Sequence, residues 1–146
     1  MGSATASSTE SWPETLGMTP DQFTALVELP EQGTCIALTS PEAANKLFYH
    51  DCRVEDQAWA FDHLTPLPLA PTLEPFNLPR FWNTPITRDY ILCSDDYSHP
   101  VALDNEFMKR LGLNTCMSIV SSHSPFLSRP ADTAKLLDLC ARGTLS

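Results

Sequence analysis

Two short turns carry the side chains of this chain that could act together in proton transfer. The first contains Asp95 and Asp96, and the second contains His123; each directly follows an apolar run. Histidine exchanges protons near neutral pH because its unperturbed pKa is about 6.5, and a neighbouring carboxylate can fix its tautomer and stabilise its charged form. These residue types predict an acid and base pair, provided that the fold brings the two turns together.

The segments around the turns have the pattern of alternating strands and helices. Strands are predicted over 88–94 and 115–120, and helices over 102–111 and 130–141. Apolar runs bounded by polar residues are typical of strands covered on both faces, so the alternation predicts a parallel α/β arrangement. The carboxyl ends of parallel strands share one edge of a sheet. Asp96 and His123 should therefore meet at that edge.

Upstream of residue 85 the pattern is mainly helical. Helices are predicted over 20–29, 41–50 and 54–63, and a strand over 34–39. Six of the 13 prolines lie between Pro66 and Pro85, so we expect an ordered, extended connector there, without regular helix or central strand. The first eleven residues are nearly all Ser, Thr, Ala and Gly, which predicts disorder.

The composition excludes several classes of function. A net charge of −9 would repel a phosphate backbone, so nucleic acid is not an expected partner. No apolar run approaches the roughly 20 residues that span a bilayer, and we expect a soluble, cytoplasmic protein without membrane contact. The five cysteines are odd in number and widely spaced, which favours reduced thiols. We expect no disulfide, no metal and no cofactor.

Three stretches, in this order and spacing, resemble the α/β-hydrolase superfamily, within it the branch of small esterases, hydroxynitrile lyases and plant salicylate-binding proteins. They are FYHDC at 48–52 with LTPLPLAP after it, YILCSDDYSHP at 90–100, and SSHSPFLSRP at 121–130. The resemblance implies a truncated α/β-hydrolase-like fold, with parallel core strands, flanking helices and a mainly helical cap segment. It begins after the disordered segment at 1–11 and implies a cap-like segment with the proline-rich connector at 12–84 and a core portion at 85–146.

The resemblance also implies roles for the two turns. Asp96 matches the family's acid, with Asp95 as a less favoured alternative, and His123 matches the catalytic histidine. Tyr49, His50 and Ser124 are implied to contact a small-molecule substrate, although a position without a substrate contact is slightly favoured for Tyr49, as a core residue, and equally favoured for His50. The remaining histidines, His63 and His99, have no predicted partner and are expected to be solvated.

The serine nucleophile of the family has no counterpart in this sequence, because no G-x-S-x-G motif occurs in it. The implied function is therefore action on a small ester or carbonyl compound, with the serine supplied by a missing portion or a partner chain. Two alternatives remain: a lyase, isomerase or cyclase that uses the acid and histidine alone, and a non-catalytic binding or assembly protein. Cys93 is a conceivable nucleophile but is expected to be buried. An unpaired sheet edge predicts a homodimer.

Overall fold

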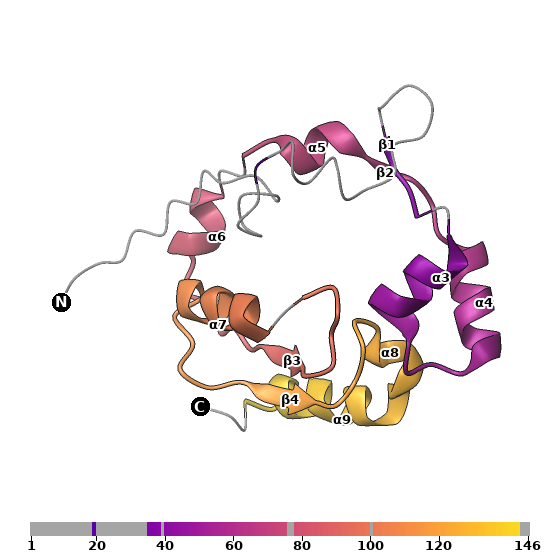
Figure 1. Ribbon diagram of the computed structural model, residues 1–146. Coiled ribbons are helices and arrows are strands. Elements are labelled where there is room, and N and C mark those ends of the chain that lie inside the picture. The colour runs from indigo at the N-terminus through magenta and orange to yellow at the C-terminus, as the bar shows by residue number, and fades with distance from the viewer. Residues whose placement is uncertain (1–18, 20–34, 39, 76–77, 100, 144–146) are drawn as a thin grey trace. The chain divides into compact units, whose positions relative to one another are not determined.

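The computed structural model describes residue 19 and residues 35–38, 40–75, 78–99 and 101–143 (Figure 1). The contacts group the chain into two compact units, Met1–Thr39 with Thr65–Ile86, and Ser40–Leu64 with Thr87–Ser146. The segment at 1–11 and the helix predicted at 20–29 lie outside the described residues. The grouping differs from the boundary expected at residue 84, because 40–64 packs with the later unit. The division into cap and core stays a prediction.

A pair of parallel strands forms the centre of the later unit. The strands β3 (Ile91–Cys93) and β4 (Met117–Ile119) align Ile91 with Met117 and Cys93 with Ile119. Leu92, Met117 and Ile119 are buried, as expected for strands that are covered on their faces. The predicted parallel pair is confirmed, although each strand is shorter than its apolar run.

Two helices flank this pair. The helices α7 (Val101–Arg110) and α9 (Pro130–Ala141) lie on either side of it in Figure 1. The α7 helix ends at Arg110, and Gly112 just after it has a φ of 75°, a backbone conformation that glycine adopts without a steric penalty. The amide of Leu113 then donates to the carbonyl of Met108 over 2.8 Å, which closes the helix end. The α/β fold class predicted from the sequence is confirmed.

The helical segment before the core begins as its capping residues predict. The Ser40 side chain accepts a hydrogen bond from the amide of Ala43, and Pro41 follows at the first helical position of α3 (Pro41–Ala44). The predicted helix over 41–50 then changes to a π-helix, η1 (Asn45–Tyr49). The next helix, α4, covers Val54–Asp62. A one-turn helix, α8 (Pro125–Ser128), occupies the end of the predicted turn after β4.

The proline-rich connector contains regular structure, so the expectation of none was wrong. The strand β2 (Leu67–Pro68) pairs antiparallel with β1 (Cys35–Ile36), and two short helices follow, α5 (Leu69–Leu73) and α6 (Pro79–Asn83). Prolines are tolerated in these helices because the amides of a first helical turn have no intrahelical acceptor to lose. A two-residue strand pair likewise leaves Pro68 at an edge position.

Candidate active site

The hydrogen-bond ladder between the two strands continues into the turns that follow them. The amide of Ser94 donates to the carbonyl of Ile119 over 3.0 Å, and the amide of Asp95 donates to the carbonyl of Ser121 over 3.2 Å. The chain then turns, and the amide of Asp96 bonds back to the carbonyl of Cys93. The two turns are therefore held together by backbone before any side chain contributes.

Asp96 and His123 meet at this edge, in the geometry expected from the sequence. The Nδ1 atom of His123 lies 2.7 Å from Oδ2 of Asp96. A carboxylate can only accept a hydrogen bond, so this contact places the proton on Nδ1 and leaves the lone pair of the neutral ring on Nε2. The Asp96 side chain is 6% exposed and that of His123 is 48% exposed, so the base stays accessible while the acid is covered.

The second oxygen of Asp96 is held by its own turn. Oδ1 accepts hydrogen bonds from the amide of Ser98 at 2.8 Å, the hydroxyl of Ser98 at 2.7 Å and the amide of His99 at 3.0 Å. Burial raises the pKa of Asp96, but the hydrogen bonds from Ser98 and His123 outweigh it, and the net pKa lies below its ordinary value. Asp96 is thus a preorganised carboxylate at neutral pH.

The hydroxyl of Ser98 also lies near the histidine. Its Oγ is 2.9 Å from Nδ1 of His123, the same ring nitrogen that faces Asp96. Because Ser98 donates its hydroxyl proton to Asp96, it shares the Nδ1–H of His123 as an acceptor. Ser98 therefore belongs to the set of groups that orient the imidazole.

The imidazole of His123 packs against the π-helix. The ring of Phe48 lies 5.2 Å from that of His123, measured between centroids. The backbone beneath it is fixed by Ser122, which is fully buried and donates from Oγ to the carbonyl of Phe48 over 2.9 Å. The π-helix η1 thus touches the histidine turn through both a ring and a hydrogen bond, which agrees with the frequent occurrence of π-helices at functional sites.

His50 joins the same segment to the acid turn. Its Nε2 donates to the carbonyl of Asp95 over 2.8 Å, and its ring stacks on that of Tyr97 at 4.1 Å. Tyr49 is buried beside Phe48, and burial raises the pKa of its hydroxyl. Ser124 is also buried. The substrate contacts implied for Tyr49, His50 and Ser124 stay predictions.

A second polar cluster next to the site was not predicted. Asp104 in α7 accepts hydrogen bonds from the hydroxyl of Tyr90 and from Nδ1 of His99. The expectation that His99 is solvated was therefore wrong, because its side chain is only 21% exposed. His63 is exposed, as expected, and its Nδ1 contacts the carbonyl of Trp59 at 2.7 Å. The signal in the sequence was a histidine five residues before an aspartate across a loop-to-helix junction, which is too weak to predict a contact.

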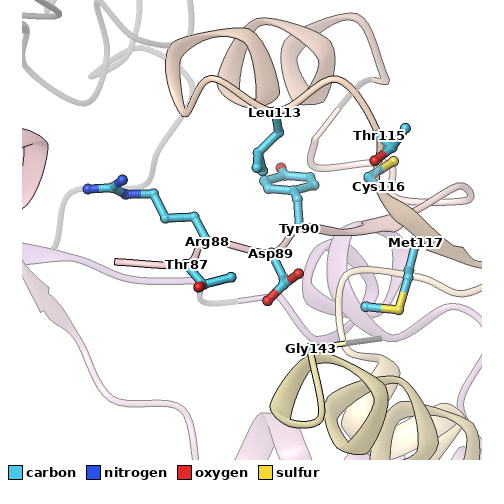
Figure 2. A pocket seen from close by; sticks show the side chains of 9 residues that line it. All are labelled: Thr87, Arg88, Asp89, Tyr90, Leu113, Thr115, Cys116, Met117 and Gly143. Atoms are coloured by element: carbon cyan, nitrogen blue, oxygen red, sulfur yellow. The ribbon is translucent and has the colours of Figure 1, made fainter. Parts of the chain in front are cut away.

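A pocket of about 330 Å³ lies at the opposite ends of the strands (Figure 2). Figure 2 shows its lining following the chain through Thr87, Arg88, Asp89 and Tyr90, just before β3, with Cys116 and Met117 at the start of β4. Asp96 and His123 follow the carboxyl ends of the same strands, so this pocket is not the site of their chemistry.

The thiols are poorly suited to act as nucleophiles. Burial raises the pKa of Cys93, and burial together with Asp51 raises the pKa of Cys52 to about 11, whereas a reactive cysteine needs a lowered pKa. The five cysteines are thiols and not parts of a disulfide. Within the described ranges, no group of three or more His, Cys, Asp or Glu side chains is placed to hold a metal. None of the helices described is long and apolar enough to cross a membrane.

Comparison with known proteins finds no matching family model and no matching curated protein. Solved structures do match. Polyneuridine aldehyde esterase is 25% identical at a TM-score of 0.60, covering 70% of this chain and 42% of the esterase. A histidine-to-alanine mutant of that enzyme is 19% identical at a TM-score of 0.62, covering 89% and 56%. A methylesterase protein, MES16 from Arabidopsis, is 21% identical at a TM-score of 0.60, covering 79% and 51%.

The chain spans about half the length of these solved structures, as the shares of 42%, 56% and 51% show. The match therefore covers part of an esterase fold, and the parallel strands and flanking helices of this chain are consistent with a truncated α/β fold. The resemblance stated from the sequence motifs is confirmed at this level: the chain has part of the α/β-hydrolase fold and is similar to plant esterases of that fold.

Proposed function

We propose that this chain contributes the acid and the histidine of an α/β-hydrolase active site that acts on a small ester or carbonyl compound. The observation that carries the proposal is the 2.7 Å contact between Nδ1 of His123 and Oδ2 of Asp96 at adjacent ends of two parallel strands. The similarity to esterase structures supports the general class of reaction.

The geometry fits a general base that is oriented by a carboxylate. With its proton held on Nδ1, His123 presents the lone pair of Nε2 and can remove a proton from a hydroxyl or a water molecule. Asp96 then stabilises the imidazolium that forms. His123 would return the proton to the leaving alkoxide in the second half of the step, so the ring ends in its starting state.

The nucleophile comes from outside these 146 residues in this proposal. The hydroxyl of Ser98 contacts His123, but it does so at Nδ1, the nitrogen that faces Asp96. A serine activated by this histidine must instead face Nε2. The sequence offers no G-x-S-x-G turn that would present one. The serine would therefore be supplied by further polypeptide or by a partner chain.

Association with a second chain is part of the same proposal. Among the described residues β3 pairs with β4 alone, so the outer edges of this two-stranded sheet have unpaired backbone groups that proteins usually cover. A second copy or a chain that bears the serine would cover them. An interface of about 800 Å² on each partner is expected for a stable complex. Sedimentation velocity at micromolar concentration measures whether the chain associates, and a monomer would contradict the proposed association.

The decisive experiment is hydrolysis of p-nitrophenyl acetate by the chain, compared with His123→Ala, Asp96→Asn and the control Asp138→Asn. Asp138 forms an exposed ion pair with Arg142 on α9, away from the two turns. Without the external serine, His123 can still activate water directly, so we expect slow hydrolysis above the buffer rate in the parent and the control, and none in the two site variants. Equal rates in all four proteins, or no hydrolysis by the parent, would overturn the esterase assignment.

A fluorophosphonate probe separates the two mechanisms that the pair could serve. The probe labels serines activated by a base, so hydrolysis without labelling of this chain would fit direct activation of water by His123 while the external serine is absent. A label mapped to a serine of this chain would overturn the external nucleophile.

The absence of a G-x-S-x-G turn also favours, as a second candidate, a lyase, isomerase or cyclase that uses Asp96 and His123 without a covalent intermediate. Cleavage of mandelonitrile without ester hydrolysis would identify it.

A further inference from the structure

A second aspartate and histidine pair, Asp104 and His99, lies next to Asp96. Asp104, in the first turn of α7, is 4% exposed. Its Oδ1 accepts hydrogen bonds from the hydroxyl of Tyr90 at 2.6 Å and from Nδ1 of His99 at 3.0 Å. Its other oxygen, Oδ2, is buried without a hydrogen-bond partner among the described residues. The buried carboxylate therefore depends on these two donors.

His99 belongs to both pairs. Its ring bonds to Asp104 and stacks on Phe107 at 5.1 Å, while its backbone amide donates to Oδ1 of Asp96 over 3.0 Å. The other oxygen of Asp96, Oδ2, accepts the hydrogen bond from His123. Because the amide of His99 holds Oδ1, the position of the His99 backbone sets the direction in which Oδ2 points. The side chain of His99 is held by the buried Asp104.

We propose that Asp104 is a positioning residue of the active site, acting through His99 to keep Asp96 directed at His123. The inference deepens the proposed function and rests on it. Tyr90 has a different part, since its hydroxyl joins Asp104 to the segment before β3, whereas the amide of His99 bonds directly to Asp96. Of the two residues that donate to Oδ1 of Asp104, Tyr90 therefore anchors α7, and His99 positions Asp96.

The tautomer of His123 tests this proposal without a substrate. Two-bond ¹H–¹⁵N correlation spectra of the full ¹⁵N-labelled chain, recorded at about pH 8 where histidine is mostly neutral, show which ring nitrogen carries the proton. We expect Nδ1–H in the parent and in the control Asp138→Asn. In Asp104→Asn and His99→Phe we expect a shift toward the Nε2–H form, which neutral histidine prefers in water.

His99→Phe keeps an aromatic ring that can stack on Phe107, so it removes the bond to Asp104 with little change in packing. Tyr90→Phe removes the other bond to the same oxygen and should lower stability while leaving the tautomer of His123 unchanged. Should Asp104→Asn fail to fold, the comparison of His99→Phe with Tyr90→Phe decides. An unchanged tautomer in His99→Phe, or an equal shift in both variants, would overturn the proposal. If the parent hydrolyses no ester, the proposed function is refuted, but the tautomer of His123 can still be compared between the parent and the variants.

Discussion

The imidazole of His50 donates from Nε2 to the carbonyl of Asp95 over 2.8 Å, and this bond joins the end of the π-helix to the turn that carries the acid. The same ring stacks on Tyr97 at 4.1 Å, one residue beyond Asp96. His50 therefore contacts the backbone on one side of Asp96 and a side chain on the other. Its contacts are those of a residue that braces the acid turn.

We expect His50→Ala to lower the free energy of unfolding by about 1 kcal/mol, the usual net value of one hydrogen bond. Urea unfolding at neutral pH measures the loss. His50→Gln retains an amide donor of similar reach and should recover part of it. If the alanine variant is as stable as the parent but loses ester hydrolysis, His50 contacts substrate and does not brace the turn.

Acid unfolding should depend on Asp96. Its pKa in the folded chain is below the ordinary 3.8, because the hydrogen bonds from Ser98 and His123 outweigh the opposite effect of burial. A lowered folded-state pKa gives stability that is present above about pH 4 and is lost as the pH falls through the folded-state pKa. We therefore expect the stability difference between the parent and Asp96→Asn to shrink below pH 4 in urea titrations.

The matched control for that titration is Asp132→Asn. The pKa of Asp132 is also lowered, through a bond from Lys135, but this pair is exposed on α9 and should contribute little to stability. A difference between the parent and Asp96→Asn that stays constant from pH 7 to pH 3 would contradict the lowered pKa.

The sequence predicts the parallel pair and its two turns because both depend on local patterns. Apolar runs locate β3 and β4, and the register of parallel strands then brings Asp96 and His123 to one edge. The helix end at Gly112 follows from a single residue type. The folded site adds distances and burial to this outline.

Other features depend on contacts that no local pattern encodes. The bond between His99 and Asp104 requires the loop to fold back onto α7, and the sequence gives no measure of that path. The π-helix over Asn45–Tyr49 differs from an α-helix in its hydrogen bonds, and apolar spacing over five residues does not separate the two. The short helices of the connector form because proline is tolerated in the first turn of a helix. The number of prolines in the sequence does not show which of them lie in such a turn.

Thiol labelling should separate the cysteines by burial. Cys116 is exposed, whereas Cys52 is buried and has a pKa of about 11. We expect Ellman's reagent at about pH 8 to modify Cys116 rapidly and Cys52 only when the chain unfolds, since the thiolate is the reactive form. Mass spectrometry of peptides locates the label, and Cys116→Ser removes the fast phase. Rapid labelling of Cys52 in the folded chain would contradict its burial and would support a cysteine thiol as the nucleophile.

Gly112→Ala tests the end of α7. The φ of 75° at this residue is unfavourable for a side chain, although an added Cβ would meet no atom within 4 Å. The cost is then backbone strain alone, and we expect a loss of about 1 kcal/mol in the free energy of unfolding. Gly112→Asn should lose less, because asparagine tolerates this conformation better. Equal stability of the alanine variant would mean that the helix ends differently in solution.

Ser98→Ala distinguishes orientation of the site from nucleophilic attack. The substitution removes the hydroxyl that bonds to Oδ1 of Asp96 and lies 2.9 Å from Nδ1 of His123, while the amide bond at 2.8 Å remains. Since the Ser98 side chain is the strongest of the bonds that lower the pKa of Asp96, we expect that pKa to rise in the variant. Carboxyl ¹³C titration by NMR measures it directly.

The same variant should keep part of the ester hydrolysis, with a loss of about fivefold, as expected when one orienting hydrogen bond of about 1 kcal/mol is removed. Ser98→Thr keeps a hydroxyl and should restore the rate of hydrolysis and the low pKa of Asp96 in part. Complete loss of hydrolysis in Ser98→Ala, with an unchanged Asp96 titration, would make Ser98 the nucleophile and reverse the assignment of the two ring nitrogens of His123.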